Sequence, residues 1–179
     1  MNNSIITDFF PIRRSTRRTE KSLKNDHDND IHQRILDNCE EGLVVEDTKI
    51  KGRGVFATKQ FDPGSFIVEY AGELISKREA RKREMEYSEL TEDVGCYMYY
   101  FTFKDKNYCI DATEETDRLG RLINHSRHHS NCESKLFEVN HIPRLVLLAS
   151  KSIKPGDELL YDYGDRAKSS INNHPWLNL

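Results

Sequence analysis

The sequence predicts a mainly β domain with short helices. Short apolar runs are separated by turn signals such as Asp62-Pro63-Gly64 and Lys154-Pro155-Gly156-Asp157, a pattern typical of small strands. The chain shows no internal repeat and no regular alternation of strand and helix patterns, so a doubly wound parallel sheet is not expected. With 179 residues, of which 36% are hydrophobic, it can form one compact domain with an appendage.

A polar tail precedes the predicted domain. Residues 1–29 contain almost no apolar side chain beyond the first dozen positions, and such a composition cannot offset the entropy lost on ordering. We therefore expect a disordered tail, followed by a leading helix over residues 30–42. Asp30 with Gln33 fits a capping box at its start, and Gly42 fits its end. One face of this helix carries Ile31, Ile35, Leu36 and Cys39.

The remaining elements follow from local patterns. Short strands are expected at residues 43–45, around Gly52 and Gly54, and at 66–70. Ser76 with Glu79 fits a second capping box, which opens a charged surface helix running to about residue 90. Aromatic and β-branched runs at 97–103 and 107–110 predict a hairpin, and runs at 144–149 and 158–161 predict two further strands.

Charge and cysteine content exclude several classes of protein. The net charge of −3 does not indicate a nucleic-acid binder, because the basic charge is local to the tail. The cysteines lie far apart without a CxxC pair, so neither a zinc cluster nor a disulfide framework is indicated. The longest apolar run, residues 145–149, is too short to cross a bilayer. We expect a soluble protein of a reducing intracellular compartment. The four cysteines are Cys39, Cys96, Cys109 and Cys132. The basic residues of the tail are Arg13, Arg14, Arg17, Arg18, Lys21 and Lys24.

A glycine-rich loop is the first segment that can carry chemistry. In Lys51-Gly52-Arg53-Gly54-Val55-Phe56 the glycines lack the Cβ that would hold a ligand away from the backbone. Taken alone, the segment fits a plain tight turn better than a binding site.

Two later segments place polar and aromatic groups close together. Arg121-Leu122-Ile123-Asn124-His125-Ser126 contains an amide and an imidazole that can bind a polar cofactor, although an isolated histidine is more often structural. Glu158-Leu159-Leu160-Tyr161-Asp162-Tyr163-Gly164 places two tyrosines on the same side of a strand, which alone indicates core packing. Together with the tyrosines of the predicted hairpin, they can instead line a narrow channel whose walls carry hydroxyl groups.

In this order, the segments resemble the SET-domain lysine methyltransferases. The resemblance rests on the Gly-x-Gly loop, the Tyr-rich hairpin, Asn-His-Ser and Glu-Leu-x-Tyr-Asp-Tyr-Gly, and it covers residues 43–165. It implies a SET-domain fold with pseudoknot-like threading of the C-terminal part. In that fold the Asn-His-Ser and Tyr-Asp-Tyr segments meet between a cofactor pocket and a lysine channel.

The resemblance also implies a ligand and individual roles. The implied cofactor is S-adenosylmethionine, and no metal is implied. Tyr163 is the implied catalytic tyrosine, and Tyr161 and Tyr70 line the lysine channel. The implied cofactor-binding residues are Lys51, Gly52, Arg53, Tyr97, Asn124, His125 and Trp176, the last stacking on the adenine.

Three segments narrow the resemblance to the subgroup that adds one methyl group to lysine twenty of histone H4. They are Gly95-Cys96-Tyr97-Met98-Tyr99-Tyr100-Phe101, Tyr161-Asp162-Tyr163-Gly164-Asp165-Arg166 and His174-Pro175-Trp176-Leu177. This subgroup closes the cofactor site with a short C-terminal segment, here residues 166–179, in place of a cysteine-rich zinc-binding tail. Tyr161 then occupies the position of a gate that limits the product to monomethyllysine.

The tail has a resemblance of its own. Residues 3–10 resemble the peptide box that docks on the sliding clamp PCNA, with Asn3 where the box usually has Gln. Thr7 and Asp8 within the box, and Arg14 four residues after Phe10, resemble the version that recruits a cullin-type ubiquitin ligase after clamp binding. The implied partner-binding residues are Ile6, Thr7, Asp8, Phe9, Phe10 and Arg14. Without this resemblance, the Phe pair could equally begin a strand or be a cloning remnant. The basic run at 13–18 fits a nuclear-import or nucleosome-contacting patch and, equally, a solvated charge run.

The sequence therefore predicts a monomeric nuclear enzyme that methylates the histone H4 tail on chromosomal nucleosomes and has roles in the cell cycle. A SET methyltransferase for a non-histone protein is the first alternative. A catalytically silent SET binding module is the second, and the presence of Asn124, His125 and Tyr163 argues against it. A clamp-binding adaptor would explain the tail and leave the four domain segments unexplained.

Overall fold

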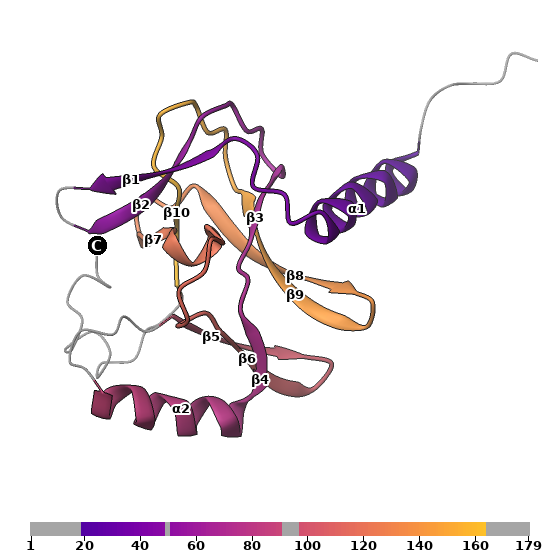
Figure 1. Cartoon of the computed structure of the whole chain (residues 1–179). Helices are drawn as coiled ribbons and strands as arrows, with labels where there is room; N and C mark the ends of the chain where they lie inside the picture. Colours follow the sequence, from indigo (N-terminus) through magenta and orange to yellow (C-terminus); the bar gives the residue numbers. More distant parts are fainter. Residues whose placement is uncertain (1–18, 49–50, 91–96, 164–179) are drawn as a thin grey trace, which may run out of the picture.

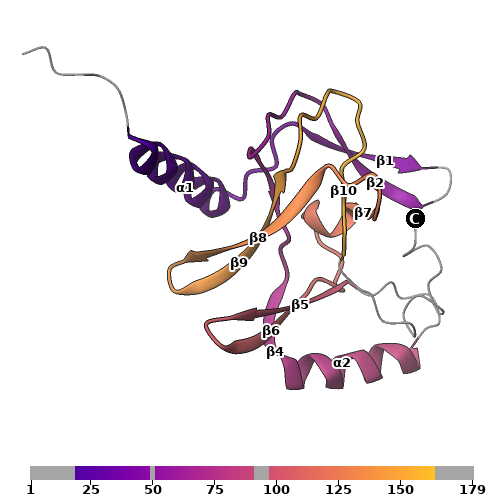
Figure 2. The same ribbon diagram turned by 180° about the vertical axis from the view of Figure 1, so that it is seen from behind.

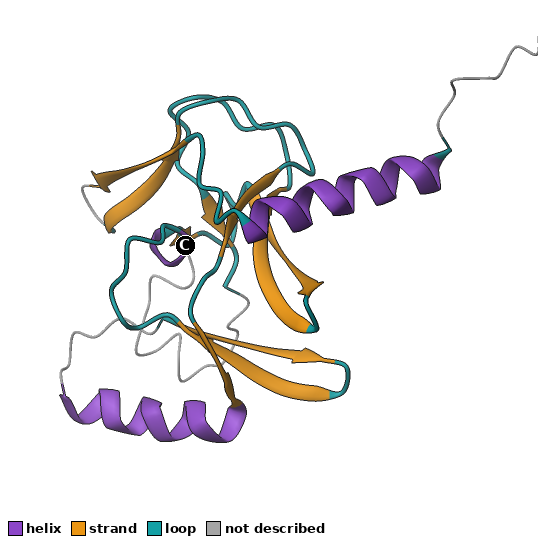
Figure 3. Ribbon diagram, turned by 45° about the vertical axis from the view of Figure 1, so that its right-hand side comes forward, coloured by secondary structure: helices purple, strands orange, loops and turns teal. Residues whose placement is uncertain are grey.

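The computed structural model describes residues 19–48, 51–90 and 97–163. Within these ranges the chain is mostly strands, with two α-helices and one short 3-10 helix (Figures 1 and 3). The predicted mainly β class is confirmed. In chain order the elements are α1 Glu20–Leu36, β1 Leu43–Thr48, β2 Gly52–Ala57, β3 Phe66–Glu69, β4 Glu73–Ser76, α2 Lys77–Leu90, β5 Met98–Phe103, β6 Lys106–Asp111, η2 Gly120–Leu122, β7 Asn124–His125, β8 Cys132–Val139, β9 Ile142–Ala149 and β10 Leu160–Tyr161.

The strands form three small sheets around one core. The sheets are β1-β2, β3-β9-β8-β10-β7 and β4-β6-β5. All neighbours are antiparallel except β10, which runs parallel to both β7 and β8. The main core includes Val55 of β2, Val68 of β3, Leu145 and Leu147 of β9, and Tyr161 of β10. Burial of these apolar side chains is the main force that brings the three sheets together.

Both long hairpins turn through residues with positive φ. Lys104 and Asp105 join β5 to β6 with φ of 47° and 60°, and Asn140 and His141 join β8 to β9 with φ of 51° and 65°. Two consecutive left-handed residues match the right-handed twist of the flanking strands. The hairpin expected at 97–110 is confirmed. The run at 144–149 lies in β9, and only the last two residues of the run at 158–161 form β10. These two strands do not pair with each other, because β9 pairs with β8 and β3 and β10 pairs with β7 and β8.

Helix α1 differs from the expectation at both ends. It begins at Glu20, where the Thr19 hydroxyl accepts from the Ser22 N–H at 3.2 Å, so residues 20–29 belong to the helix and not to a disordered tail. Asp30 therefore lies inside the helix and pairs with Arg34 at 2.8 Å instead of capping. The helix ends at Leu36, well before Gly42.

Only one end of α1 is anchored to the domain. Ile31 and Ile35 pack with a small cluster from β3, β8 and β9 that includes Phe66 and Leu148. Leu36, expected on the same face, is 48% exposed. The N-terminal half of the helix projects away from the domain in both opposite views (Figures 1 and 2). The polar composition of that half explains why the sequence predicted no structure there.

Helix α2 covers the sheet of β4, β5 and β6. The Ser76 hydroxyl accepts from the Glu79 N–H at 3.2 Å, which confirms the predicted start. Arg83 and the Tyr87 hydroxyl both donate to the buried Asp111 of β6, at 3.0 and 2.9 Å. The other face of α2 is charged and exposed, as expected for a surface helix.

The C-terminal part of the described chain threads between two earlier strands. Strand β10 lies between β7 and β8, with Tyr161 opposite both His125 and Cys132. Residues 126–131 cross this strand, and the Asn131 side chain accepts from the Leu160 N–H and donates to the Glu158 carbonyl, both at 2.8 Å. This arrangement is the threading that the resemblance implied, and it joins two segments more than thirty residues apart in the sequence.

Candidate active site

The β1–β2 hairpin supplies one edge of the site. Gly52 has a φ of +72°, a conformation that glycine adopts without strain. Gly54 is needed for a different reason, because a Cβ there would lie 2.9 Å from the Asn124 side-chain nitrogen and 3.2 Å from a Glu158 oxygen. The Lys51 ammonium and the Arg53 guanidinium extend from the same hairpin and pair with the carboxylates of Glu158 and Glu115.

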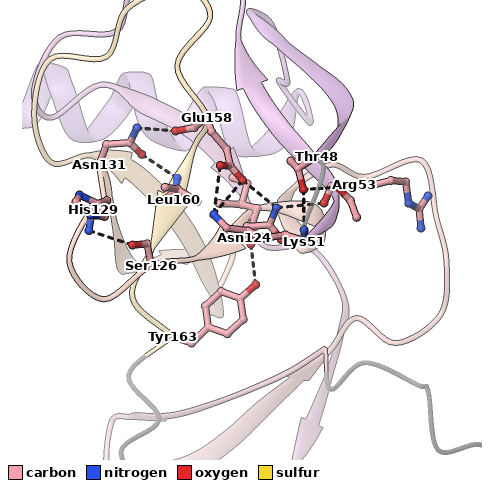
Figure 4. Close-up of polar contacts among 12 residues, drawn as sticks. Thr48, Lys51, Arg53, Asn124, Ser126, His129, Asn131, Glu158, Leu160 and Tyr163 are labelled. Atoms are coloured by element: carbon pink, nitrogen blue, oxygen red, sulfur yellow. Dashed lines mark hydrogen bonds and ion pairs between the residues drawn. The ribbon is translucent and has the colours of Figure 1, made fainter. Parts of the chain in front are cut away.

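Asn124 lies where this edge meets the threaded strands. Its side-chain nitrogen donates to the Arg53 carbonyl at 3.2 Å and to Glu158 Oε1 at 3.0 Å (Figure 4). Its backbone pairs with Leu160 of β10. The side-chain amide is therefore held by two segments far apart in the sequence, the β1–β2 hairpin and the segment that leads into β10. This edge of the site is polar, charged and partly open to solvent.

The opposite side is aromatic and largely buried. The Tyr163 N–H donates to His125 Nδ1 at 3.1 Å. The Tyr163 hydroxyl donates to the Ile123 carbonyl at 2.8 Å (Figure 4). The Tyr163 ring lies 4.6 Å from that of Tyr161 and 5.0 Å from that of His125, centroid to centroid. Hydrogen bonds at both ends fix the position of the Tyr163 phenol.

Tyr70 adds a third phenol to this side. Its hydroxyl donates to the Tyr97 carbonyl at 3.0 Å, and its ring lies 5.8 Å from that of Tyr99. The hydroxyls of Tyr99 and Ser134 are 2.8 Å apart. Tyr97 in turn stacks beneath the buried Arg121 guanidinium, whose carbon is 3.9 Å from the ring centre. These contacts connect the β5–β6 hairpin to the aromatic side of the site.

Burial controls the protonation of the two threaded tyrosines. Removal from water disfavours the phenolate, so the pKa of Tyr161 lies well above its ordinary value. The pKa of Tyr163 is raised for the same reason, with a smaller contribution from the nearby Tyr97. Both phenols are therefore neutral near pH 7, where they can donate and accept hydrogen bonds but cannot act as anionic bases.

The structure brings together the predicted residues that it describes. Lys51, Gly52, Arg53 and Asn124 gather on the polar side, and the aromatic side holds the four others: Tyr70, Tyr97, Tyr161 and Tyr163. His125 lies at the junction of the two sides. Trp176 and the tail residues Ile6, Thr7, Asp8, Phe9, Phe10 and Arg14 fall outside the described ranges.

Sequence reasoning missed three residues that hold the site in place. Glu158 begins the Glu-Leu-x-Tyr-Asp-Tyr-Gly motif, and Arg121 begins the segment that contains Asn-His-Ser, but the sequence predicted no role for either side chain. Asn131 was not singled out, although its amide bridges the threaded strands. Arg121 and Glu158 each begin a motif, which marks their positions in the sequence, but a charged side chain gives no local sign of what it contacts. Nothing local indicates the role of Asn131, because its partners are nearly thirty residues away.

Other surface features do not compete with this site. Hollows of about 540 and 430 Å³ lie along α2, but their walls are long charged side chains and the outer face of β5–β6, and no predicted site residue lines them. In the part of the chain that the structure describes, no group of three or more His, Cys, Asp or Glu side chains could hold a metal ion. No described helix is long and apolar enough to cross a membrane.

Comparison with known proteins agrees with this geometry. The family model described as the SET domain matches residues 52–164. Because this match spans more than half of the chain, the protein belongs to the SET-domain family. The predicted family and fold are thereby confirmed.

Individual relatives are similar over nearly the whole chain. The N-lysine methyltransferase KMT5A-A of Danio rerio is 50% identical over 175 residues, which cover 98% of this chain and 50% of that protein. The histone-lysine N-methyltransferase Set8 of Drosophila melanogaster is also 50% identical, over 98% of this chain and 25% of that protein. A crystal structure of CpSET8 from Cryptosporidium superposes with a TM-score of 0.72 at 38% identity, over 86% of this chain and 70% of that one. The chain thus spans about half the length, or less, of these two curated relatives.

Proposed function

We propose that the protein is an S-adenosylmethionine-dependent protein-lysine methyltransferase. The observation that carries this proposal is the meeting of a charged edge and an aromatic side at β7 and β10, where Asn124 pairs with Leu160 and His125 with Tyr161. Its similarity to proteins named as lysine methyltransferases supports the same activity.

The polar edge has suitable donors for the proposed cofactor. S-adenosylmethionine carries a carboxylate, an ammonium and a sulfonium, and when bound it supplies the methyl group. The Lys51 ammonium and the Arg53 guanidinium can bind a carboxylate, and the Asn124 amide can bind polar groups beside it. Gly52 leaves room for a ligand, because a Cβ there would meet nothing within 4 Å. Lys51, Gly52, Arg53, Tyr97, Asn124 and His125 would hold the cofactor, together with Trp176.

The aromatic side suits a lysine side chain. Tyr70 and Tyr161 are only 5% and 2% exposed, so an amine placed between them leaves bulk water. Desolvation lowers the pKa of an amine, which favours loss of its proton. The neutral hydroxyl of Tyr163 can then orient the nitrogen lone pair for an in-line displacement. Because both threaded tyrosines are neutral, the proton leaves the amine for water and not for a phenolate.

We further propose histone H4, at lysine twenty of its tail, as the substrate on nucleosomes, with one methyl group added. The relatives named for histone-lysine methylation support a histone substrate, and Tyr161 beside Tyr163 supports a narrow channel. A protein that acts on nucleosomes works in the nucleus, on chromosomes. Mass spectrometry of recombinant nucleosomes after incubation with the chain and S-adenosylmethionine tests residue and methylation state together. We expect monomethyllysine at that position and none on nucleosomes carrying arginine there, and modification of another residue would contradict the substrate assignment.

The tail supports a separate proposal, that the chain binds PCNA and is then recognised by a cullin-type ubiquitin ligase. The box carries it, with Ile6, Thr7, Asp8, Phe9 and Phe10, together with Arg14 four residues further on. This recognition would limit the enzyme to part of the cell cycle. Replacing Phe9 and Phe10 by Ala should abolish PCNA binding in calorimetry and leave nucleosome methylation unchanged. Unaltered PCNA affinity would contradict this assignment.

A further inference from the structure

Glu158 lies where the charged edge meets the threaded strands. Its carboxylate contacts the Lys51 ammonium at 3.3 Å and the Asn124 amide nitrogen at 3.0 Å (Figure 4). Its backbone carbonyl accepts from the Asn131 side chain, which ties the same residue to the crossing segment. The Glu158 side chain is 21% exposed, so these contacts are partly shielded from water. One residue therefore contacts the β1–β2 hairpin loop, β7 and the crossing segment.

The contacts of Asn124 determine which way its amide faces. Both partners of the amide nitrogen, the Arg53 carbonyl and the Glu158 carboxylate, can only accept hydrogen bonds. The nitrogen must face them, and the amide oxygen is therefore turned to the opposite side. There it can accept a hydrogen bond from a bound molecule. Without the carboxylate, a single carbonyl would remain to hold this orientation.

Gly54 indicates how closely this arrangement is packed. A Cβ at that position would crowd both the Asn124 nitrogen and the Glu158 carboxylate. The absence of a side chain on the neighbouring strand therefore permits the contact between the two. Lys51, by comparison, reaches the carboxylate at 3.3 to 3.4 Å from an exposed position. A long contact from a solvent-accessible ammonium contributes little energy, so the amide contact is the more consequential of the two.

We propose that Glu158 is a positioning residue for the cofactor, acting by holding the Asn124 amide with its oxygen towards the ligand. The inference rests on the proposed function, because it requires that Asn124 contacts S-adenosylmethionine. Glu158 acts by accepting a hydrogen bond from Asn124, and the ion pair between Glu158 and Lys51 is of secondary importance.

Two substitutions of similar size separate these roles. Glu158→Gln keeps an oxygen that accepts from Asn124 but removes the charge that faces Lys51. Glu158→Met keeps the length of the side chain and removes the acceptor. Binding of S-adenosylmethionine is measured by calorimetry, and folding by the thermal unfolding midpoint. Glu138→Gln is the control, because Glu138 pairs with Lys104 on the distant hairpins in the same way as Glu158 pairs with Lys51.

We expect Glu158→Gln to bind within about threefold of wild type and Glu158→Met to bind at least about tenfold more weakly, a difference that corresponds to loss of one hydrogen bond. In an Asn124→Ala background the Met substitution should cause no further loss, because the group through which it acts is gone. Equal weakening by Gln and Met would show that charge matters instead and would overturn the inference. So would wild-type affinity for Met, or additive losses in the double variant. Failure of the wild-type chain to bind the cofactor would overturn the proposed function as well.

Discussion

The two sides of the candidate site differ in physical character, because one is charged and exposed and the other is aromatic and largely buried. On the proposed cofactor side, Lys51 and Arg53 are exposed cations paired with carboxylates. On the proposed lysine side, Tyr161 and Tyr163 are neutral rings, and Tyr161 is almost fully buried. The two-residue pairing of β7 with β10 joins the sides, since Asn124 faces one and His125 contacts the other. Substitutions should therefore separate binding from chemistry, according to the side on which they fall.

The largest separation is expected at Tyr163. Tyr163→Phe removes the hydroxyl that donates to the Ile123 carbonyl and leaves the charged side untouched. We expect methylation to fall at least about 100-fold, which corresponds to about 2.7 kcal/mol of transition-state stabilisation, with cofactor affinity unchanged. Single-turnover rates and calorimetry on the same preparation measure the two effects. A methylation rate within about twofold of wild type would remove Tyr163 from the chemistry.

A substitution at Gly54, on the proposed cofactor side, should have the reverse effect and weaken cofactor binding more than it slows the reaction. Gly54→Ala places a methyl group 2.9 Å from the Asn124 amide nitrogen, so either the amide or the strand must shift. Cofactor affinity should weaken by roughly tenfold, about 1.4 kcal/mol, with a smaller effect on the rate at saturating cofactor. Val44→Ala, at an exposed position of the same hairpin, serves as the control and should bind normally. Equal binding by both variants would contradict the close packing of Asn124 against this strand.

Tyr161 tests the width of the lysine side. Tyr161→Phe keeps the ring and removes one hydroxyl, which makes space beside the amine and releases any water held there. The product should shift from monomethyl to dimethyl lysine, while the first transfer changes by no more than about threefold. Mass spectrometry of the peptide product resolves the two states. A wild type that already makes dimethyl lysine, or a variant that stops at one methyl group, would contradict the gate.

The smallest expected effect is on stability at alkaline pH. The pKa values of Tyr161 and Tyr163 are raised by burial, so the unfolded chain ionises these tyrosines at about pH 10 while the native chain keeps them neutral. Their contribution is fully present below about pH 10 and is lost as the pH rises further. The unfolding midpoint of Tyr163→Phe should therefore fall less steeply between about pH 9 and 11 than that of wild type. Parallel curves would show that Tyr163 is accessible to solvent in the native state.

Much of the fold could be predicted from local pattern. The β5–β6 hairpin and the start of α2 were predicted because aromatic alternation and a Ser-x-x-Glu cap are local signals. Strand β8 was missed because charged residues interrupt its apolar pattern in Cys-Glu-Ser-Lys-Leu-Phe-Glu-Val. The predicted start of α1 was wrong because the first turns of this helix are polar and project from the core. They have no hydrophobic face, and only helix propensity and the Thr19 cap stabilise them.

The site was less accessible to local reasoning than the fold. That Asn124, His125 and Tyr163 lie together could be predicted, because the resemblance placed them in recognisable motifs. Glu158 and Asn131 were not assigned roles because their partners come from distant segments, and a charged or amide side chain looks solvated until the threading is known. The need for glycine at position 54 could not be predicted from the sequence either, because it depends on the position of the Asn124 side chain in the fold.

A crystal structure of the chain with S-adenosylhomocysteine and a histone H4 peptide tests the two-sided site most directly. We predict that the cofactor product lies against Lys51, Arg53 and Asn124, and that the peptide lysine enters from the other side, between Tyr70 and Tyr161. Its nitrogen should lie within hydrogen-bonding distance of one of the threaded tyrosine hydroxyls and point at the sulfur. A lysine that reaches the sulfur from the charged edge, or a cofactor bound away from Asn124, would contradict the account.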